Sequence, residues 1–223
     1  MVQTTEYTFL HFTKAKTLTW PDYAAYLERL LAGGVTAVPH PLLYYESEIS
    51  SWPQLFALRR VRQLAPQPAQ SVLVVQQPSW PLHHILLVVR GEVGDETAVI
   101  WAKILAQASG ADVTILPIIP PYPGMYQMGN KVQADLNILL QPNTTSGQRL
   151  LHYEDQLSEA NVTNHFCQQS GTPDRQVWQA VNRLEPDMIV VGKEKYGRLY
   201  RWLLGEIVTP LLRWVDRPLL IAK

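Results

Sequence analysis

The sequence HILLVVRG at residues 84–91 decides the fold of this chain. Its apolar residues do not alternate with polar ones, which is typical of a strand covered on both faces of a parallel sheet. An acidic helix start at Asp95 follows, with apolar residues at helical spacing until Gly110 ends the pattern. A second apolar run at residues 113–119, with Pro117 near its end, completes a strand, helix and strand crossover. The stretch therefore predicts a parallel α/β domain.

The same alternation continues to the C-terminus. Residues 120–147 form an irregular insertion that could contain a helix at 132–140. After it, a helix is predicted at 148–160, a weak strand at 164–169 and a helix that begins at Thr172-Pro173-Asp174. The last predicted elements are a strand at 187–192, a helix at 200–215 and a strand at 218–222. Together these elements predict an open parallel sheet of five strands with helices on both faces. A ligand is expected at the C-terminal ends of its first and fourth strands, where the strand order reverses.

Composition narrows the class of protein. Hydrophobic residues make up 47% and charged residues 17% of the 223 residues, which predicts a packed globular protein. Nineteen basic residues balance nineteen acidic ones, so we expect neither nucleic acid nor a membrane as a partner. The single Cys167, the absence of zinc-site spacing and the lack of a signal-like N-terminus predict a cytoplasmic protein without a metal.

The proline cluster at residues 78–81 is the best domain boundary. It separates an N-terminal extension, residues 1–82, from the α/β domain at residues 83–223. Within the extension we expect helices at 21–31 and 53–64, an extended segment at 35–45 and a strand at 71–75.

Two segments of the α/β domain carry a family resemblance. They are residues 85–91, which enter a helix, and residues 186–192, which continue through Leu203-Leu204-Gly205 to residues 216–221. The chain here resembles the universal stress protein family, and Gly171 and Pro173 also match the family's entry into a helix. The resemblance implies an adenine-nucleotide alpha-hydrolase-like fold and a cytoplasmic stress-response or regulatory protein.

The nucleotide-binding members of that family carry Gly-x2-Gly-x9-Gly-(Ser/Thr) after the fourth strand. Glycines at this spacing let the backbone approach phosphate, and the hydroxyl and amides at the helix start bind the anion. Gly192 and Gly205 stand thirteen positions apart, as the motif requires, but Lys195 replaces the middle glycine and Glu206 replaces the Ser/Thr. A glutamate about 4 Å from phosphate repels it by roughly 1 kcal/mol in water and several-fold more in a sheltered cleft.

The end of the first strand departs from the family as well. Members usually have Asp there, which accepts hydrogen bonds from the ribose, whereas Arg90 only donates. Arg90, Lys195 and Glu206 could form their own salt-bridged set in the crevice. Glu206 could instead complement the helix macrodipole, and Gly197 could serve the turn if the loop is shifted by two residues. The degenerate nucleotide site that the resemblance implies comprises Arg90, Ile118, Gly192, Lys195, Gly205, Glu206 and Ile207.

Two functions follow from this site. The first is a regulatory protein that acts by protein association and binds ATP weakly or not at all; the alternative is a switch that binds ATP or AMP in the same crevice. We expect no enzyme, or at most weak nucleotide hydrolysis, since the sequence places no nucleophile beside a general base.

The resemblance also suggests how the terminal strand is used, because family dimers pair through their final strands. Residues 55–64 and 70–75 are similar to the last helix and strand of another such domain, so the extension is interpreted as the remnant of a tandem copy. The protein is then either a homodimer or an intrachain pseudo-dimer in which residues 72–75 lie against residues 219–222. The sequence does not identify its protein partner.

Overall fold

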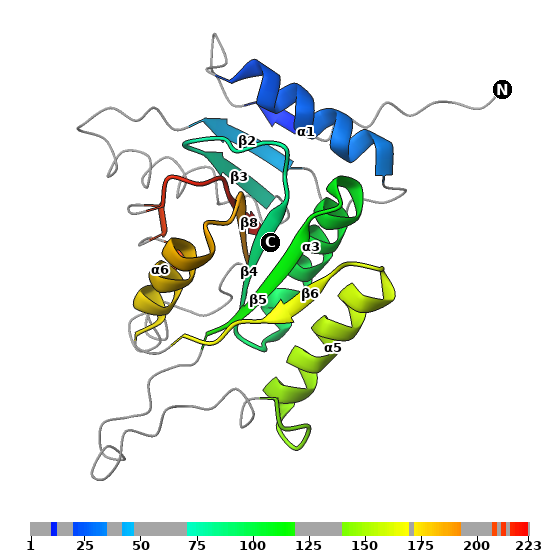
Figure 1. Ribbon diagram of the computed structural model, residues 1–223, viewed down its shortest axis with the longest axis vertical. Helices are drawn as coiled ribbons and strands as arrows, with labels where there is room; N and C mark the ends of the chain where they lie inside the picture. The colour runs from blue at the N-terminus through cyan, green and yellow to red at the C-terminus, as the bar shows by residue number, and fades with distance from the viewer. Residues whose placement is uncertain are drawn as a thin grey trace, which may run out of the picture.

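The computed structural model describes residues 10–12, 20–34, 42–46, 71–118, 140–169, 172–192, 207–208, 211–212 and 215–222. These residues form one sheet with helices on both faces (Figure 1). The helices are α1 (Pro21–Gly34), α3 (Glu96–Ser109), α5 (Thr145–Glu159) and α6 (Pro173–Leu184), with a short 3-10 helix η1 at Val93–Asp95. The strands are β1 (Leu10–Phe12), β2 (Leu42–Glu46), β3 (Ser71–Val75), β4 (His84–Val89), β5 (Asp112–Pro117), β6 (Asn164–Phe166), β7 (Met188–Gly192) and β8 (Leu219–Ala222).

The strand order is β1-β2-β3-β8-β7-β4-β5-β6. Its C-terminal half, from β8 to β6, is entirely parallel, so the predicted α/β fold class and its parallel five-stranded sheet are confirmed. The N-terminal half adds β1, β2 and β3, which are parallel to one another. The sheet is therefore larger than the sequence predicted, with eight strands among the described residues.

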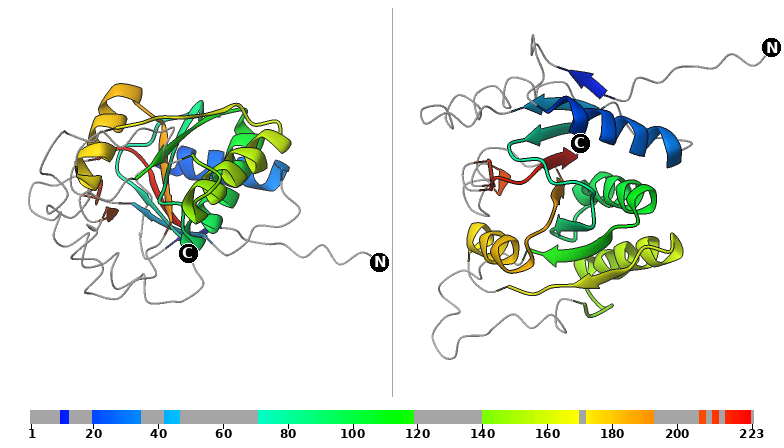
Figure 2. Two further views of the ribbon diagram at one scale, coloured as in Figure 1. Left: turned by 90° about the horizontal axis from the view of Figure 1, so that it is seen from below. Right: turned by 45° about the horizontal axis from the view of Figure 1, so that its top comes forward.

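The alternation of side chains along the buried strands produces two apolar layers. Ile85 and Leu87 of β4 pack with α1, α3 and α5 on one face of the sheet. Leu86 and Val88 pack on the opposite face with α6 and with Leu211, which precedes β8. Figure 2 shows α6 on the other side of the sheet from α3 and α5. Both faces of β4 are thus covered, which explains its uninterrupted apolar sequence.

Several predicted boundaries need correction. The helix expected from residue 148 begins at Thr145, because the hydroxyl of Thr144 accepts a hydrogen bond from the Gly147 amide at 3.0 Å and caps the helix. The strand expected at 164–169 ends at Phe166, where its pairing with β5 ends. The helix expected at 53–64 lies outside the described residues, as does the helix expected at 132–140 except for its last residue, which is in a turn. The first part of the helix expected at 200–215 also lies outside them.

The strand β3 covers the edge of the parallel sheet. It runs antiparallel to β8, with Val72 opposite Ile221, Leu73 opposite Leu220 and Val74 opposite Leu219. The expected contact between residues 72–75 and 219–222 is therefore present within one chain. Its side chains enter both apolar layers, since Leu73 joins the α1, α3 and α5 layer while Val72 joins the other.

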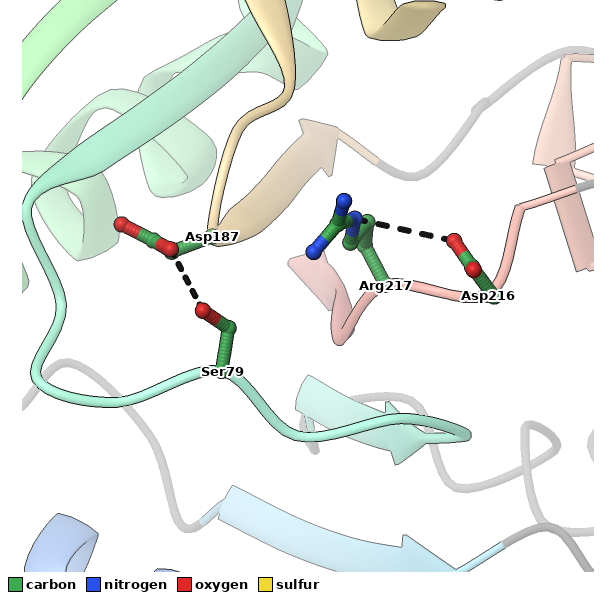
Figure 3. A network of polar contacts seen from close by, with 4 residues as sticks. All are labelled: Ser79, Asp187, Asp216 and Arg217. Atoms are coloured by element: carbon green, nitrogen blue, oxygen red, sulfur yellow. Dashed lines mark hydrogen bonds and ion pairs between the residues drawn. The ribbon is translucent and has the colours of Figure 1, made fainter.

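Hydrogen bonds hold the connection from β3 to β4 against the end of the sheet where β8, β7 and β4 begin. The Gln77 amide donates to the Asp216 carbonyl at 2.7 Å. The Ser79 hydroxyl donates to the Asp187 carboxylate at 2.6 Å (Figure 3), and the amides of His83 and His84 donate to the same carboxylate at 2.9 and 3.0 Å. Asp187, directly before β7, thus holds the proline-rich connection against the domain that follows it.

We predict that Leu73→Lys lowers the free energy of unfolding by at least about 3 kcal/mol, because it removes a buried side chain and places an ammonium in the apolar layer. It should also release β3 from β8 and so alter the oligomeric state. Urea unfolding and sedimentation velocity measure the two effects. Thr163→Lys, at an exposed position before β6, is the control. If Leu73→Lys changed neither quantity, β3 would not be part of the folded sheet.

We also predict that Asp187→Asn destabilises the protein by on the order of 1–3 kcal/mol at neutral pH, since it weakens hydrogen bonds to a charged acceptor. Burial opposes ionisation, but the hydrogen bonds from Ser79, His83 and His84 outweigh it and lower the pKa of Asp187. A lowered pKa stabilises the fold above the ordinary value of 3.8, and this contribution is lost as the pH falls below it.

Denaturation at a series of pH values tests this sign. The difference between wild type and Asp187→Asn should shrink as the pH falls below about 4. The control is Asp216→Asn, whose carboxylate is exposed and forms an ion pair with its neighbour Arg217 at 3.6 Å, drawn in Figure 3. A difference between wild type and Asp187→Asn that did not depend on pH would contradict the assigned role.

Candidate functional site

The candidate site lies at the C-terminal ends of β4 and β7. These strands are neighbours, with Ile85 beside Met188 and Val88 beside Val191. The chain leaves β4 toward β5 on one side, whereas β7 lies on the other, so the strand order reverses between them. This is the switch point at which parallel α/β sheets bind ligands, and it is formed by the first and fourth strands of the parallel half, as predicted.

The loop from β4 to α3 lies at this switch point, and its centre is Asp95. The Asp95 side chain is 5% exposed. Its carboxylate accepts hydrogen bonds from the backbone amides of Arg90 at 2.7 Å and Glu92 at 3.0 Å. Successive amides that point toward one place form a concave anion-binding site. Here that place is taken by a carboxylate of the chain itself.

Burial raises the pKa of Asp95, although the loop amides and the positive charge of Arg90 act in the opposite direction. The net shift is upward, because the carboxylate has lost most of its contact with water. The same hydrogen bonds nevertheless satisfy amides that would otherwise be buried without an acceptor. Asp95 and its loop therefore depend on each other structurally.

Helix α5 holds the outer side of the loop. Gly91 has a φ of +70°, and a Cβ on it would lie 3.0 Å from both the Cβ and the carbonyl oxygen of Ser146. The Tyr153 hydroxyl donates to the Glu92 carbonyl at 2.7 Å. Burial raises the pKa of the Tyr153 hydroxyl, so it remains a donor throughout the physiological range. Glycine is required at residue 91 by conformation and by space.

Gly192 ends β7 directly beneath the same loop. A Cβ on Gly192 would lie 2.8 Å from the Gly94 carbonyl oxygen and 3.0 Å from an oxygen of the Asp95 carboxylate. Any larger residue would therefore push the loop away from the sheet. Gly192 therefore has a packing role against the loop.

The structure brings together part of the predicted nucleotide site. Arg90 lies beside Asp95 and acts on it electrostatically. Ile118 is buried at the end of β5, where its amide donates to the Val89 carbonyl at 2.7 Å, and Ile207 is buried in the α6 layer. The remaining predicted residues, Lys195, Gly205 and Glu206, lie outside the described residues, so a salt-bridged set with Arg90 stays a prediction.

Asp95 itself was missed as a site residue. From the sequence, Asp95 is expected to be an acidic residue at the start of α3, where it would interact favourably with the helix macrodipole. A signal was present, because Glu92 and Asp95 stand three positions apart before a helix, as in a capping box. Sequence spacing gives no indication, however, that the carboxylate turns back over Gly192.

Histidines gather at the opposite end of the sheet. The Thr114 hydroxyl lies 2.8 Å from Nε2 of His84 and 2.9 Å from Nε2 of His165, and it bridges β4 and β6 across β5. Within the part of the chain that the structure describes, no three histidine, cysteine or carboxylate residues are placed to bind a metal. The described ranges also contain no helix that is both long and apolar enough to cross a bilayer.

Comparison with solved structures supports this description of the fold. A universal stress protein from Archaeoglobus fulgidus DSM 4304 is similar over 82% of this chain, with a TM-score of 0.55 and 14% identity, and the chain spans 60% of that protein's length. A functionally unknown protein, PA1789 from Pseudomonas aeruginosa PAO1, is similar over 96% of this chain and 91% of its own, with a TM-score of 0.53 and 13% identity.

A third structure, of the hypothetical protein MJ0577, covers 64% of this chain and 96% of its own, with a TM-score of 0.51 and 16% identity. A search of the curated proteins found no match. The family model described as the universal stress protein family matches residues 81–223, which is more than half of the chain and includes β4 to β8. The chain therefore belongs to the universal stress protein family.

Proposed function

We propose that this chain is a regulatory member of the family that acts by associating with another protein and that binds ATP or AMP weakly or not at all. The observation that carries the proposal is the Asp95 carboxylate, buried between the β4–α3 loop and Gly192. It brings negative charge to the strand ends where a nucleotide would lie. A phosphate about 4 Å from it would be repelled by roughly 1 kcal/mol in water and by more in a sheltered crevice.

The residues that would contact the sugar and the phosphates support the same proposal. Arg90 directly follows β4, where a ribose-binding carboxylate would be needed, and its guanidinium cannot accept a hydrogen bond from a hydroxyl. Glu206 adds a second carboxylate at the motif position that should supply a hydroxyl, and Lys195 adds a side chain where the motif has glycine. We assign no catalytic role to Asp95, because one oxygen of its buried carboxylate already accepts hydrogen bonds from two backbone amides.

We further propose that β3 replaces the final strand of a second subunit. One side of β8 pairs with β7 and the other with β3, so its hydrogen-bonding edges are used within the chain. The helices α1 and α3 are both fourteen residues long, lie on the same face and pack against each other. This supports a pseudo-two-fold arrangement in which β1, α1, β2 and β3 correspond to β4, α3, β7 and β8. The extension would then be a tandem copy that lacks the equivalents of β5 to α6.

Calorimetric titration with ATP, ADP and AMP tests the proposed absence of strong nucleotide binding. We expect no binding at micromolar concentrations and no rise in Tm, whereas a ligand present at 100 times its Kd would add about 2.7 kcal/mol of stability. The double variant Lys195→Gly with Glu206→Ser should gain affinity, since it restores the motif.

A matched control is Glu28→Ser with Arg29→Ser, which removes one charge of each sign from the exposed face of α1. Micromolar affinity of the wild type for ATP would contradict the proposal and favour a nucleotide-binding switch. If the double variant bound no better than the control, Lys195 and Glu206 would not be the cause of weak binding.

A further inference from the structure

The amides of the β4–α3 loop and the carboxylate they hold form a complete anion site. Two hydrogen bonds, of 2.7 Å from the Arg90 amide and 3.0 Å from the Glu92 amide, reach the same carboxylate oxygen of Asp95. The site lies at the start of α3, where the helix macrodipole also favours negative charge. Its geometry and charge are those of a site for a phosphate oxygen.

The Asp95 carboxylate is covalently part of the loop whose amides it binds. Asp95 lies within the same short loop as both amide donors, so its effective concentration at the site is far above that of any free anion. An external phosphate would have to displace it and leave the buried carboxylate without partners, which is unfavourable. The anion site is therefore closed to ligands while Asp95 is in place.

The same carboxylate also reaches the second side of the crevice. Its other oxygen lies 3.0 Å from the position that a Cβ on Gly192 would take, so it lies over the residue where the family's phosphate motif begins. A phosphate that approached Gly192 would meet this oxygen. One side chain thus affects both the first-strand loop and the start of the fourth-strand loop.

We propose that Asp95 is the specificity-determining residue of this crevice, an internal substitute for a ligand phosphate that excludes tetrahedral oxyanions from it. The proposal deepens the proposed function, because it names a residue that, in addition to Lys195 and Glu206, opposes phosphate binding there. It applies to inorganic phosphate and to the phosphate of a nucleotide alike, since both offer the same acceptor oxygens.

The test compares the wild type with Asp95→Ala and with Glu96→Ala. Glu96 is exposed in the first turn of α3, so its variant makes the same change in charge without vacating the amides. Tm is measured in sodium phosphate, sodium formate and sodium chloride at equal ionic strength. With phosphate at about ten times its Kd, the Tm of Asp95→Ala should rise by about 3–6 °C over chloride, with no such rise in the other two proteins.

Formate should raise the Tm of Asp95→Ala as well, because it restores a carboxylate to the vacated amides. Titration of Asp95→Ala with AMP and with adenosine shows whether the phosphate can belong to a nucleotide. If the crevice accepts a nucleotide, AMP should bind and adenosine, which has no phosphate, should not. Equal anion effects in all three proteins would overturn the proposal.

If Asp95→Ala does not fold, Asp95→Asn provides the second test, since it keeps the volume and one acceptor oxygen. Its Arg90 and Glu92 amide protons should move upfield in NMR spectra relative to the wild type, and in Glu96→Ala they should not move. Unchanged shifts in Asp95→Asn would contradict the assigned contacts.

The two proposals fail in different ways. Tight ATP binding by the wild type would refute the proposed function and, with it, the exclusion of nucleotide phosphate by Asp95. Absence of ATP binding without anion rescue would refute the role of Asp95 alone.

Discussion

The hydrogen bonds between β3 and β8 are the constraint on which the rest of the structure depends. A parallel sheet that ended at β8 would present unpaired amides and carbonyls along an exposed strand. The antiparallel pairing with β3 satisfies them and extends one sheet from β1 to β6. It also brings α1 against α3 in a common apolar layer. Residues before the proline-rich connection thereby become part of the same core as the family domain.

The position of the candidate site follows from the order of the parallel strands. Because β4 and β7 are adjacent, the loop after β4 comes to rest on the end of β7, and a glycine at residue 192 lets the two approach closely. Gly192 thus accommodates Gly94 and Asp95, and the space above it serves internal packing.

Much of the parallel half could be predicted from sequence, because strands buried on both faces have continuous apolar sequences. The apolar runs of β4 and β7 have both faces covered, and the Thr172-Pro173 start of α6 is a local signal. The contacts of Asp95 could not be predicted, because they join segments far apart in the chain and an acidic helix start already has a sufficient local explanation. The start of α5 at Thr145 could not be predicted, because the residues before it are typical of turns. The strand β1 has three residues and is too short to show a periodic pattern.

Hydrogen exchange of the native protein, followed residue by residue by NMR at two protein concentrations, tests the central claim most directly. If β3 and β8 form one structural unit within the chain, amides of Val72 to Val74 and of Leu219 to Ile221 should be protected with the same opening free energy at both concentrations. Unprotected β3 amides, or protection of β8 that increased with protein concentration, would show instead that a second molecule covers this edge.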